Sequence, residues 1–277
     1  MKLFDIIGLP KLDFLEPAFN VLPDEAYTDS LLMLSADKAL MVVDEEEWPV
    51  ALAVRTEHGW KGANFILRGP TVEVVERYGE LGGEVMETTQ EAWMRGTREM
   101  YSLALQRLTP PSMEDFSPER ASLVKKLIED NWGEGNGEVC LDCGCGSGMG
   151  AAVLRGLGFS SLAYDNDPSL LSLGLAKGRL LPEETMLIDA SLATHYLRPS
   201  EYGLALMAGT INEYTALVWK GILKELMDLC QETMVTVESQ KEADLVRLWA
   251  LGAGRRARIV ENLNDAFYDR WICLIED

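Results

Sequence analysis

The stretch Val139-Cys140-Leu141-Asp142-Cys143-Gly144-Cys145-Gly146-Ser147-Gly148-Met149-Gly150 decides the fold of this chain. Its apolar run, Val139 to Leu141, predicts a buried β-strand that ends at the carboxylate of Asp142. The alternating glycines predict a tight turn, because glycine adopts positive φ and lets a ligand approach the backbone closely. Residues 151–155 favour a helix. The order is therefore strand, turn and helix N-terminus, and that terminus offers free N–H groups to a ligand.

Two nucleotide-binding interpretations fit this loop. The spacing Gly146-x-Gly148-x-x-Ala151 satisfies a permissive form of the dinucleotide fingerprint, which leaves a nicotinamide or flavin cofactor open. With Asp142 included, the loop reads Asp-x-Gly-x-Gly-x-Gly and resembles motif I of the S-adenosylmethionine-dependent methyltransferases of the Rossmann-like class. A structural turn that binds no ligand is the third interpretation.

Carboxylates at the ends of predicted strands support a nucleoside ligand. In open α/β sheets the ligand lies at the carboxyl ends of the strands, and three of these ends carry Asp142, Asp165 and Asp189. Carboxylates accept hydrogen bonds from ribose hydroxyls, an exocyclic amine or an ammonium group. Two of the three leave an alternative open, because Asp165 could cap a strand end and Asp189 could be an ordinary turn residue. Asp167, directly before Pro168, is interpreted as a helix N-cap.

The resemblance, which covers about residues 118–277, assigns a role to each position. The residues that it implies along the methionine part of S-adenosylmethionine are Asp142, Gly144, Gly146, Gly148, Ala208 and Gly209. Of these, Asp142 would lie near the ammonium group, directly or through water. The residues implied around the adenosine part are Asp165 at the ribose hydroxyls, Asn166 beside the adenine, and Asp189 with Ala190 at the adenine amine and ring.

Beyond the loop, strands and helices alternate. The strands are predicted at 161–165, 185–189, 203–207 and 232–238, and the helices from Pro168, over 214–229 and over 240–251. Such alternation predicts a parallel sheet with helices on both faces. Residues 256–261 and 270–275 break the rhythm, because only a short loop separates these two strand-like runs. They predict a terminal antiparallel hairpin, which is typical of the seven-stranded methyltransferase fold and not of an ordinary dinucleotide domain.

The first part of the chain has a different pattern. Residues 1–30 show no sustained period and are predicted to form an irregular arm. Three strand-like runs, at 39–44, 50–56 and 64–68, predict a small antiparallel meander. A helix is expected after Thr71, and a longer one, running to Leu108, is expected behind the capping-box spacing Thr88-x-x-Glu91.

These patterns predict two domains and one fold class. Pro110-Pro111 breaks the chain, and Ser117-Pro118 restarts a helix that should end near Trp132. The predicted division is therefore an N-terminal α+β domain at 1–115 and a Rossmann-like domain at 116–277. The fold class is α/β, with a seven-stranded, mostly parallel sheet and a C-terminal antiparallel hairpin.

Charge and composition restrict the partners. The 277 residues contain 25 Lys and Arg against 45 Asp and Glu, a net charge of −20. Because affinity for nucleic acid comes mainly from neutralising phosphates, DNA and RNA are disfavoured as substrates. No run of about 18 apolar residues predicts a membrane span. The start of the chain, with Asp5 and Pro10, lacks the apolar core of a signal peptide, so a cytoplasmic protein is expected.

The cysteines and histidines give weaker signals. Cys140, Cys143 and Cys145 have a spacing that could suit a metal, but they lie in the strand and between the glycines, so small buried side chains and no metal are expected. For catalysis, Glu213 after the fourth strand is a candidate base, with a helix N-terminal charge as its alternative role. His195, after the third strand, is the second candidate, with a surface or packing role as its alternative.

The predicted function is methyl transfer from S-adenosylmethionine to a small-molecule acceptor, with the N-terminal region helping to cover the acceptor. The segment Gly209-Thr210-Ile211-Asn212-Glu213-Tyr214 lacks the Asn/Asp-Pro-Pro-aromatic motif of enzymes that methylate amide or base nitrogens. A protein methyltransferase is the first alternative. A non-catalytic domain that binds the nucleoside, or has lost it, is the second, and a nicotinamide-dependent oxidoreductase is the third.

Overall fold

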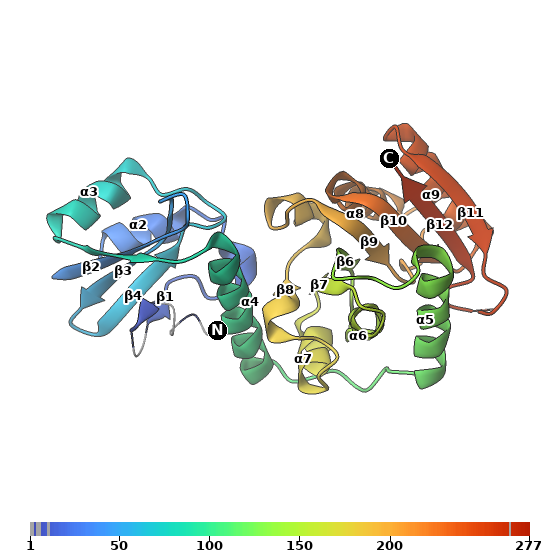
Figure 1. Cartoon of the computed structure of the whole chain (residues 1–277), viewed down its shortest axis with the longest axis horizontal. Coiled ribbons are helices and arrows are strands. Elements are labelled where there is room, and N and C mark those ends of the chain that lie inside the picture. The colour runs from blue at the N-terminus through green and yellow to red at the C-terminus, as the bar shows by residue number, and fades with distance from the viewer. Residues whose placement is uncertain (1–2, 4–6, 10–11, 266) are drawn as a thin grey trace. The chain divides into compact units, whose positions relative to one another are not determined.

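The computed structural model describes residues 3, 7–9, 12–265 and 267–277. The chain divides into two compact units, Met1–Ala104 and Leu105–Asp277, each of which is described separately (Figure 1). The division falls inside a helix, because Leu105 packs against a buried cluster of the second unit. The described residues include no helix with both the length and the apolar character to cross a bilayer. Asp5 and Pro10 lie outside the described residues.

In its described residues, the first unit is a five-stranded sheet accompanied by helices. In sheet order its strands are β1 (Asp13–Phe14), β4 (Gly59–Asn64), β3 (Pro49–Thr56), β2 (Lys38–Val43) and β5 (Glu84–Glu87). Its helices are α2 (Ala26–Leu32), α3 (Val72–Glu80) and α4 (Gln90–Leu108), with a short 3-10 turn, η1 (Phe19–Val21). The antiparallel meander β2-β3-β4 is present, and β1 and β5 extend it as parallel edge strands.

Three local predictions for this unit were wrong. The strand predicted at 64–68 ends at Asn64, because Thr56 pairs with Gly59 across a two-residue turn and the strand starts early. The arm predicted to be irregular contains β1 and η1 and the start of α2. Thr89, not Thr88, caps α4: its hydroxyl accepts from the Ala92 N–H, whereas the Thr88 N–H donates to the Val43 carbonyl of the sheet.

The second unit is a seven-stranded sheet covered by helices. In sheet order its strands are β11 (Arg256–Glu261), β12 (Trp271–Glu276), β10 (Cys230–Val237), β9 (Ser200–Ala205), β6 (Val139–Cys143), β7 (Ser160–Asp165) and β8 (Thr185–Leu187). Its helices are α5 (Pro118–Trp132), α6 (Met149–Gly156), α7 (Pro168–Ala176), α8 (Ala216–Leu229) and α9 (Gln240–Gly252), with 3-10 turns η2 (Pro182–Glu184) and η3 (Ala190–His195). Strand β12 runs antiparallel to both neighbours, and β10, β9, β6, β7 and β8 are parallel.

This sheet confirms the predicted fold class. The helix restart at Ser117 is correct, since its hydroxyl accepts from the Arg120 N–H and Pro118 opens α5. The terminal hairpin is also present, with β12 inserted between β11 and β10. The main core packs α5 and α6 on the sheet through Val124, Ile128 and Leu154. Strand β9 begins and ends earlier than the predicted 203–207, so residues 206–209 form a connection at the sheet edge.

Candidate functional site

The candidate site is at one edge of the second sheet. Because β6, β7, β9 and β10 are parallel, their carboxyl ends meet at the same edge. The glycine loop follows β6 at this edge. Strand β11 is antiparallel to β12, which is antiparallel to β10, so residues 262–265 and 267–270, between these two strands, lie at this edge too. The carboxyl ends of β7, β9 and β10 and the glycine loop after β6, which are distant in sequence, therefore lie along one edge of the sheet.

The glycine loop has the backbone that its sequence predicts. Gly144, Gly146 and Gly148 have φ of 65°, 54° and 84°, a region that side chains disfavour. A Cβ on Gly148 would lie 2.6 Å from Leu180 Cγ, whereas one on Gly144 or Gly146 would meet no atom within 4 Å. Packing therefore requires a glycine at position 148. Positions 144 and 146 leave their backbone open to an approaching group.

Asp142 lies buried behind this loop, one residue before the end of β6. Its carboxylate accepts from the Ala151 N–H in the first turn of α6, and a Cβ on Gly150 would lie 2.8 Å from Oδ2. The pKa of Asp142 is raised from 3.8 to about 7, mainly by burial and in part by the nearby Asp165, whereas the Ala151 N–H and Arg155 act in the opposite direction. Oδ2 is buried and has no hydrogen-bond partner. A buried acceptor of this kind suits a cationic or hydrogen-bond-donating group.

Asp165 is the last residue of β7 and joins the loop to the next helix. Its Oδ2 accepts from the Gly146 N–H at 2.8 Å, and its Oδ1 accepts from the Asp167 N–H at 2.8 Å. Each carboxylate oxygen can accept a second hydrogen bond, which leaves capacity for two hydroxyl donors. Asn166 beside it is exposed. Asp167 caps α7, as predicted, by accepting from the N–H groups of Ser169 and Leu170.

Asp189 lies two residues beyond β8 and is exposed. The Ile188 N–H donates to the Asp165 carbonyl at 3.1 Å, which brings the segment beside the end of β7. Asp189 Oδ1 accepts from the N–H and the hydroxyl of Ser191, so this side chain caps η3, which Ala190 opens. The turn role that the sequence left open is therefore present at Asp189.

The fourth strand contributes the connection at 206–209. Ala208 is buried and its N–H donates to the Thr236 carbonyl at 3.0 Å. A Cβ on Gly209 would lie 3.3 Å from the Trp219 ring. Met207, which the sequence did not single out, has a φ of 48°. No local sequence signal marks it, because a methionine does not predict left-handed backbone.

The two candidate bases are both exposed. Glu213 lies in the turn before α8, and Asn212 accepts there from the N–H groups of Tyr214 and Thr215. Because α8 begins at Ala216 with Thr215 as its N-cap, Glu213 lies in the turn directly before the helix and not in its first turn. His195 ends η3.

A set of contacts that the sequence pattern does not predict, here called the brace, joins Ser147 of the glycine loop to Arg179 and to residues 114–116. The Ser147 hydroxyl donates to Asp115 Oδ1 at 2.5 Å, and Arg179 Nε donates to the Ser147 carbonyl at 2.9 Å. Arg179 also pairs with Glu114 at 2.7 Å, and this hydrogen bond is the main cause that lowers the pKa of Glu114 to about 2, together with the Phe116 N–H and Lys177. The Arg179 guanidinium lies over the Phe116 ring, 5.1 Å from its centroid. The linker 114–116 is thereby fixed to the loop.

The cysteines of the loop are free and buried. Burial raises the pKa of Cys143 to about 12, so its thiol is protonated at neutral pH. Within the described residues, no group of three or more His, Cys, Asp or Glu side chains is placed to hold a metal ion.

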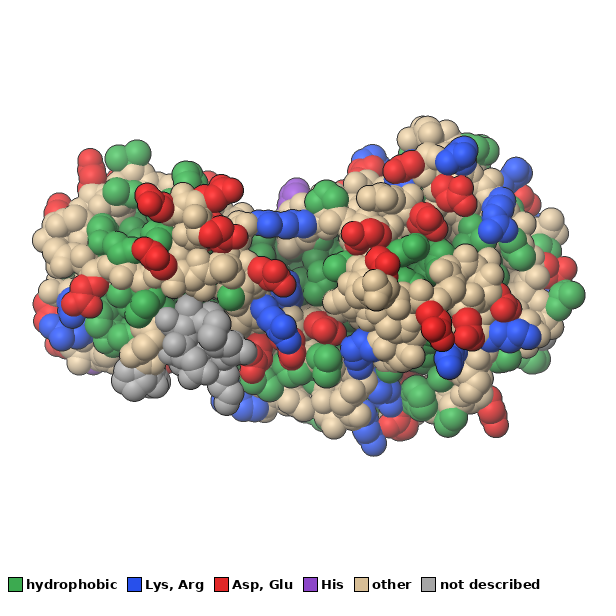
Figure 2. Space-filling view, in the orientation of Figure 1, with side chains coloured by type: hydrophobic (Ala, Val, Ile, Leu, Met, Phe, Trp, Pro, Cys, Tyr) green, Lys and Arg blue, Asp and Glu red, His purple; other side chains and the backbone are tan. Residues whose placement is uncertain are grey.

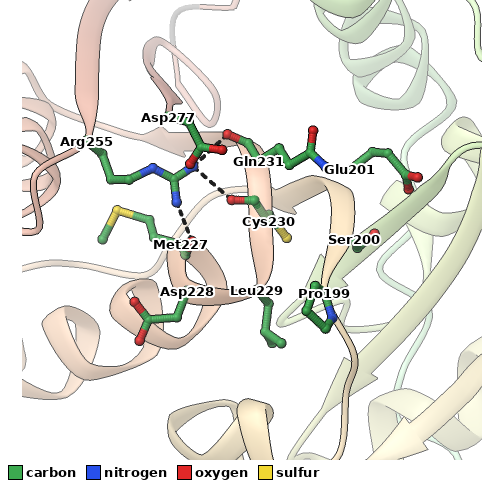
Figure 3. A pocket seen from close by; sticks show the side chains of 10 residues that line it. All are labelled: Pro199, Ser200, Glu201, Met227, Asp228, Leu229, Cys230, Gln231, Arg255 and Asp277. Atoms are coloured by element: carbon green, nitrogen blue, oxygen red, sulfur yellow. Dashed lines mark hydrogen bonds and ion pairs between the residues drawn. The ribbon is translucent and has the colours of Figure 1, made fainter.

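A pocket of about 220 Å³ lies at the opposite edge of the sheet, at the amino ends of β9 and β10 (Figure 3). Arg255 points into it, but its guanidinium donates to the carbonyls of Cys230 and Gln231 at 2.8 and 2.6 Å and pairs with Asp277 at 2.9 Å. Since its donors are used within the protein, this pocket does not resemble an anion site.

Comparisons with known proteins give distant structural similarities only. Neither protein-family profiles nor curated proteins give a match. Among solved structures, magnesium protoporphyrin IX methyltransferase from Synechocystis PCC 6803, with bound SAM, is 13% identical at a TM-score of 0.46, covering 68% of this chain and 97% of that one. An rRNA methylase from Streptococcus thermophilus is 15% identical at a TM-score of 0.41, covering 60% and 98%.

A third solved structure, precorrin 8W decarboxylase from Methanobacterium thermoautotrophicum, is 19% identical at a TM-score of 0.43, covering 58% of this chain and 90% of that one. These similarities are distant, so the strand order itself carries the assignment. A sheet of five parallel strands, with an antiparallel strand inserted beside the last of them by a terminal hairpin, is the arrangement implied by the resemblance of the loop. The second unit of this chain therefore has the fold of the Rossmann-like, seven-stranded methyltransferases.

Proposed function

We propose that this protein binds S-adenosylmethionine at the carboxyl edge of the second sheet and transfers its methyl group to a small molecule. One observation supports this most strongly. The glycine loop is hydrogen-bonded to the strand-end acid Asp165, because the Gly146 N–H donates to Asp165 Oδ2 at 2.8 Å. The Oδ2 atom of Asp142, which has no hydrogen-bond partner, is buried behind the loop. This arrangement combines open main chain with acceptors for hydroxyl and ammonium donors.

The residues fit the ligand as follows. Asp142 would hold the ammonium group of the methionine part, directly or through water, since a cation beside a buried carboxylate offsets its desolvation. Asp165 would accept from the two ribose hydroxyls with the lone pairs that its backbone contacts leave. The remaining proposed contacts are Gly144, Gly146 and Gly148 on the methionine side with Ala208 and Gly209, and Asn166, Asp189 and Ala190 around the adenine.

The chemistry requires little from the protein. S-adenosylmethionine supplies a methyl group already activated on a sulfonium. The chain's own residues would align the acceptor with that methyl group and exclude water. A base is needed only where the acceptor must lose a proton, and Glu213 and His195 are the proposed candidates.

A small-molecule acceptor is proposed because the surface is acidic. Acidic side chains are spread over both units in the view of Figure 2, and the net charge is −20. Such a surface repels phosphate backbones and leaves nucleic acids disfavoured. A polypeptide acceptor is the alternative, and it requires the first unit to bind a partner protein.

The binding test is a thermal shift in parallel with S-adenosylmethionine, S-adenosylhomocysteine, NAD and NADP. A ligand at 100-fold over its dissociation constant stabilises by about 2.7 kcal/mol, a measurable shift in Tm. We expect a shift with the two sulfur nucleosides and none with the nicotinamides. The reverse pattern would indicate an oxidoreductase.

Turnover is tested separately, by mass spectrometry of small-molecule and protein fractions incubated with isotopically labelled S-adenosylmethionine. Label in a small molecule supports the main proposal, and label in protein supports the polypeptide alternative. Binding without any transfer would favour a non-catalytic module.

A further inference from the structure

The backbone at Met207 is in an unfavourable conformation that packing does not explain. Its φ of 48° lies in the left-handed region, which is unfavourable for a non-glycine residue. The side chain is 43% exposed, so the conformation gains no deep burial in return. Something else must hold it, and strained residues of this type gather at ligand sites.

Thr236 of β10 holds this segment. The Met207 N–H donates to Thr236 Oγ1 at 2.6 Å, and the next N–H, of Ala208, donates to the Thr236 carbonyl at 3.0 Å. Thr236 is fully buried. One threonine therefore binds two consecutive N–H groups on either side of the left-handed residue.

The direction of these hydrogen bonds is set by a buried ion pair. The Thr236 hydroxyl donates its single proton to Asp269 Oδ1 at 2.6 Å, which leaves a lone pair to accept from Met207. Asp269 is 1% exposed and pairs with Arg120 of α5, Nε to Oδ2 at 3.0 Å. The Arg120 guanidinium lies 4.8 Å from the centroid of the Tyr268 ring. A chain of contacts thus runs from α5 through Asp269 and Thr236 to Met207.

A second attachment fixes the other end of the segment. Buried Glu242 of α9 accepts from the Ile211 N–H at 2.9 Å through Oε1, while its Oε2 completes the capping box with Ser239. Residues 207–211 are therefore held at both ends by side chains from the neighbouring elements.

We propose that Thr236 and Asp269 are positioning residues: they hold Met207 left-handed so that the main chain of 207–209 is fixed where the methionine part of S-adenosylmethionine lies. This inference rests on the proposed function. If the network serves the conformation, glycine at 207 makes it dispensable, because glycine adopts that φ without strain. If it serves packing alone, glycine at 207 changes nothing.

The test uses the full chain and four variants: Thr236→Val, Thr236→Ser, Met207→Gly with Thr236→Val, and Thr233→Val. Thr233→Val is the matched control, since Thr233 is a buried threonine on the same strand whose hydroxyl has no hydrogen-bond partner. One readout is hydrogen exchange of the amides at 207–209. The other is the affinity for S-adenosylhomocysteine by titration calorimetry.

Thr236→Val should speed exchange at 207–209 and weaken binding by about tenfold, the loss of one well-placed hydrogen bond. The affinity of Thr236→Ser for S-adenosylhomocysteine should stay within about twofold of that of the unmodified chain. The same holds for Thr233→Val, because both variants keep the accepting oxygen at position 236. The double variant should recover most of the lost affinity, although its Tm stays below that of the unmodified chain.

Equal losses in Thr236→Val and in the double variant would overturn the positioning role, as would unchanged exchange at 207–209 in Thr236→Val. Failure of the proposed function is a separate outcome, in which the unmodified chain does not bind S-adenosylhomocysteine. The exchange comparison still decides the conformational role in that case.

Discussion

At the scale of single residues, Asp142 and Asp165 divide two tasks between neighbouring carboxylates. Asp142 is buried with a raised pKa and an unpartnered oxygen, whereas Asp165 is partly exposed and bonded to two backbone N–H groups. The environments differ because Asp142 is one residue inside its strand and faces α6, while Asp165 ends its strand at the sheet edge. Burial therefore couples ligand binding at Asp142 to loss of a proton, whereas Asp165 holds the main chain of the glycine loop in place.

The raised pKa of Asp142 predicts proton release on ligand binding. Folded Asp142 keeps its proton up to about pH 7, and the unfolded chain loses it near 3.8, so this group's contribution to stability falls as pH rises between these values. An ammonium group beside Oδ2 lowers that pKa. Binding of S-adenosylhomocysteine at pH 6 should release close to one proton, measured by calorimetry in buffers of different ionisation enthalpy.

Asp142→Asn is the control for this linkage. The variant should bind S-adenosylhomocysteine at least tenfold more weakly and without proton release. Its free energy of unfolding should not show the decrease between pH 5 and pH 8 that Asp142 causes in the unmodified chain. Proton uptake by the unmodified chain would contradict the assignment of the ammonium group to Asp142.

Asp165 and its neighbour offer a matched pair of substitutions. Asp165→Asn replaces one acceptor oxygen by an amide donor that faces a backbone N–H. We therefore expect S-adenosylhomocysteine to bind at least about tenfold more weakly, and the free energy of unfolding to fall by about 1–3 kcal/mol. Asp167→Asn should change neither, because asparagine caps helices as well as aspartate does. Titration calorimetry and urea unfolding measure both. Equal effects of the two substitutions would mean that Asp165 has only a turn role.

At the scale of elements, the glycine loop is fixed by parts of the chain that do not belong to its own strand or helix. The connection after α7 supplies Arg179, and the linker before α5 supplies Glu114 and Asp115. The loop backbone is thus fixed before any ligand binds. Fixed main chain binds a ligand with less loss of conformational entropy.

Arg179→Met tests this brace. It removes the hydrogen bond to Ser147 and the ion pair with Glu114, so the variant should unfold at lower urea than the unmodified chain at pH 7. The pKa of Glu114 is lowered from 4.5 to about 2, mainly by Arg179, so the stabilisation from that pair is present above pH 4.5 and is lost as pH falls toward 2. The stability difference should therefore narrow at pH 4.

Lys177→Met is the comparison for Arg179→Met. Lys177 pairs with the same Glu114 at 3.2 Å, but both side chains are about half exposed, and such pairs contribute little. If Lys177→Met lowers the free energy of unfolding as much as Arg179→Met does, then charge alone, and not the hydrogen bond to Ser147, stabilises the segment 114–116.

At the scale of the whole molecule, the excess of acidic side chains is the dominant electrostatic property. A net charge of −20 makes the folded chain repel itself. Tm should rise by a few degrees between 10 and 300 mM NaCl, because salt screens this repulsion. A rise with sodium sulfate but not with NaCl would instead indicate strengthened apolar burial. Scanning calorimetry measures both series.

The sequence determined the second unit to a large extent. The strand-turn-helix around the glycine loop, the Ser117 cap, the Asp167 cap and the terminal hairpin are set by residues close together in the chain. Periodicity, turn glycines and caps are local signals, so they can be predicted without knowledge of the fold. The parallel strands then bring the strand-end acids to one edge.

Only the tertiary structure decided the remaining features. The edge strands β1 and β5 are too short and too exposed to carry a periodic pattern. The brace at Ser147 and the left-handed Met207 depend on partners distant in sequence, and Arg120 and Asp269 are 149 positions apart. Contacts of this type form only when the sheet has assembled. Packing and buried charge, which no local pattern encodes, therefore set the details of the candidate site.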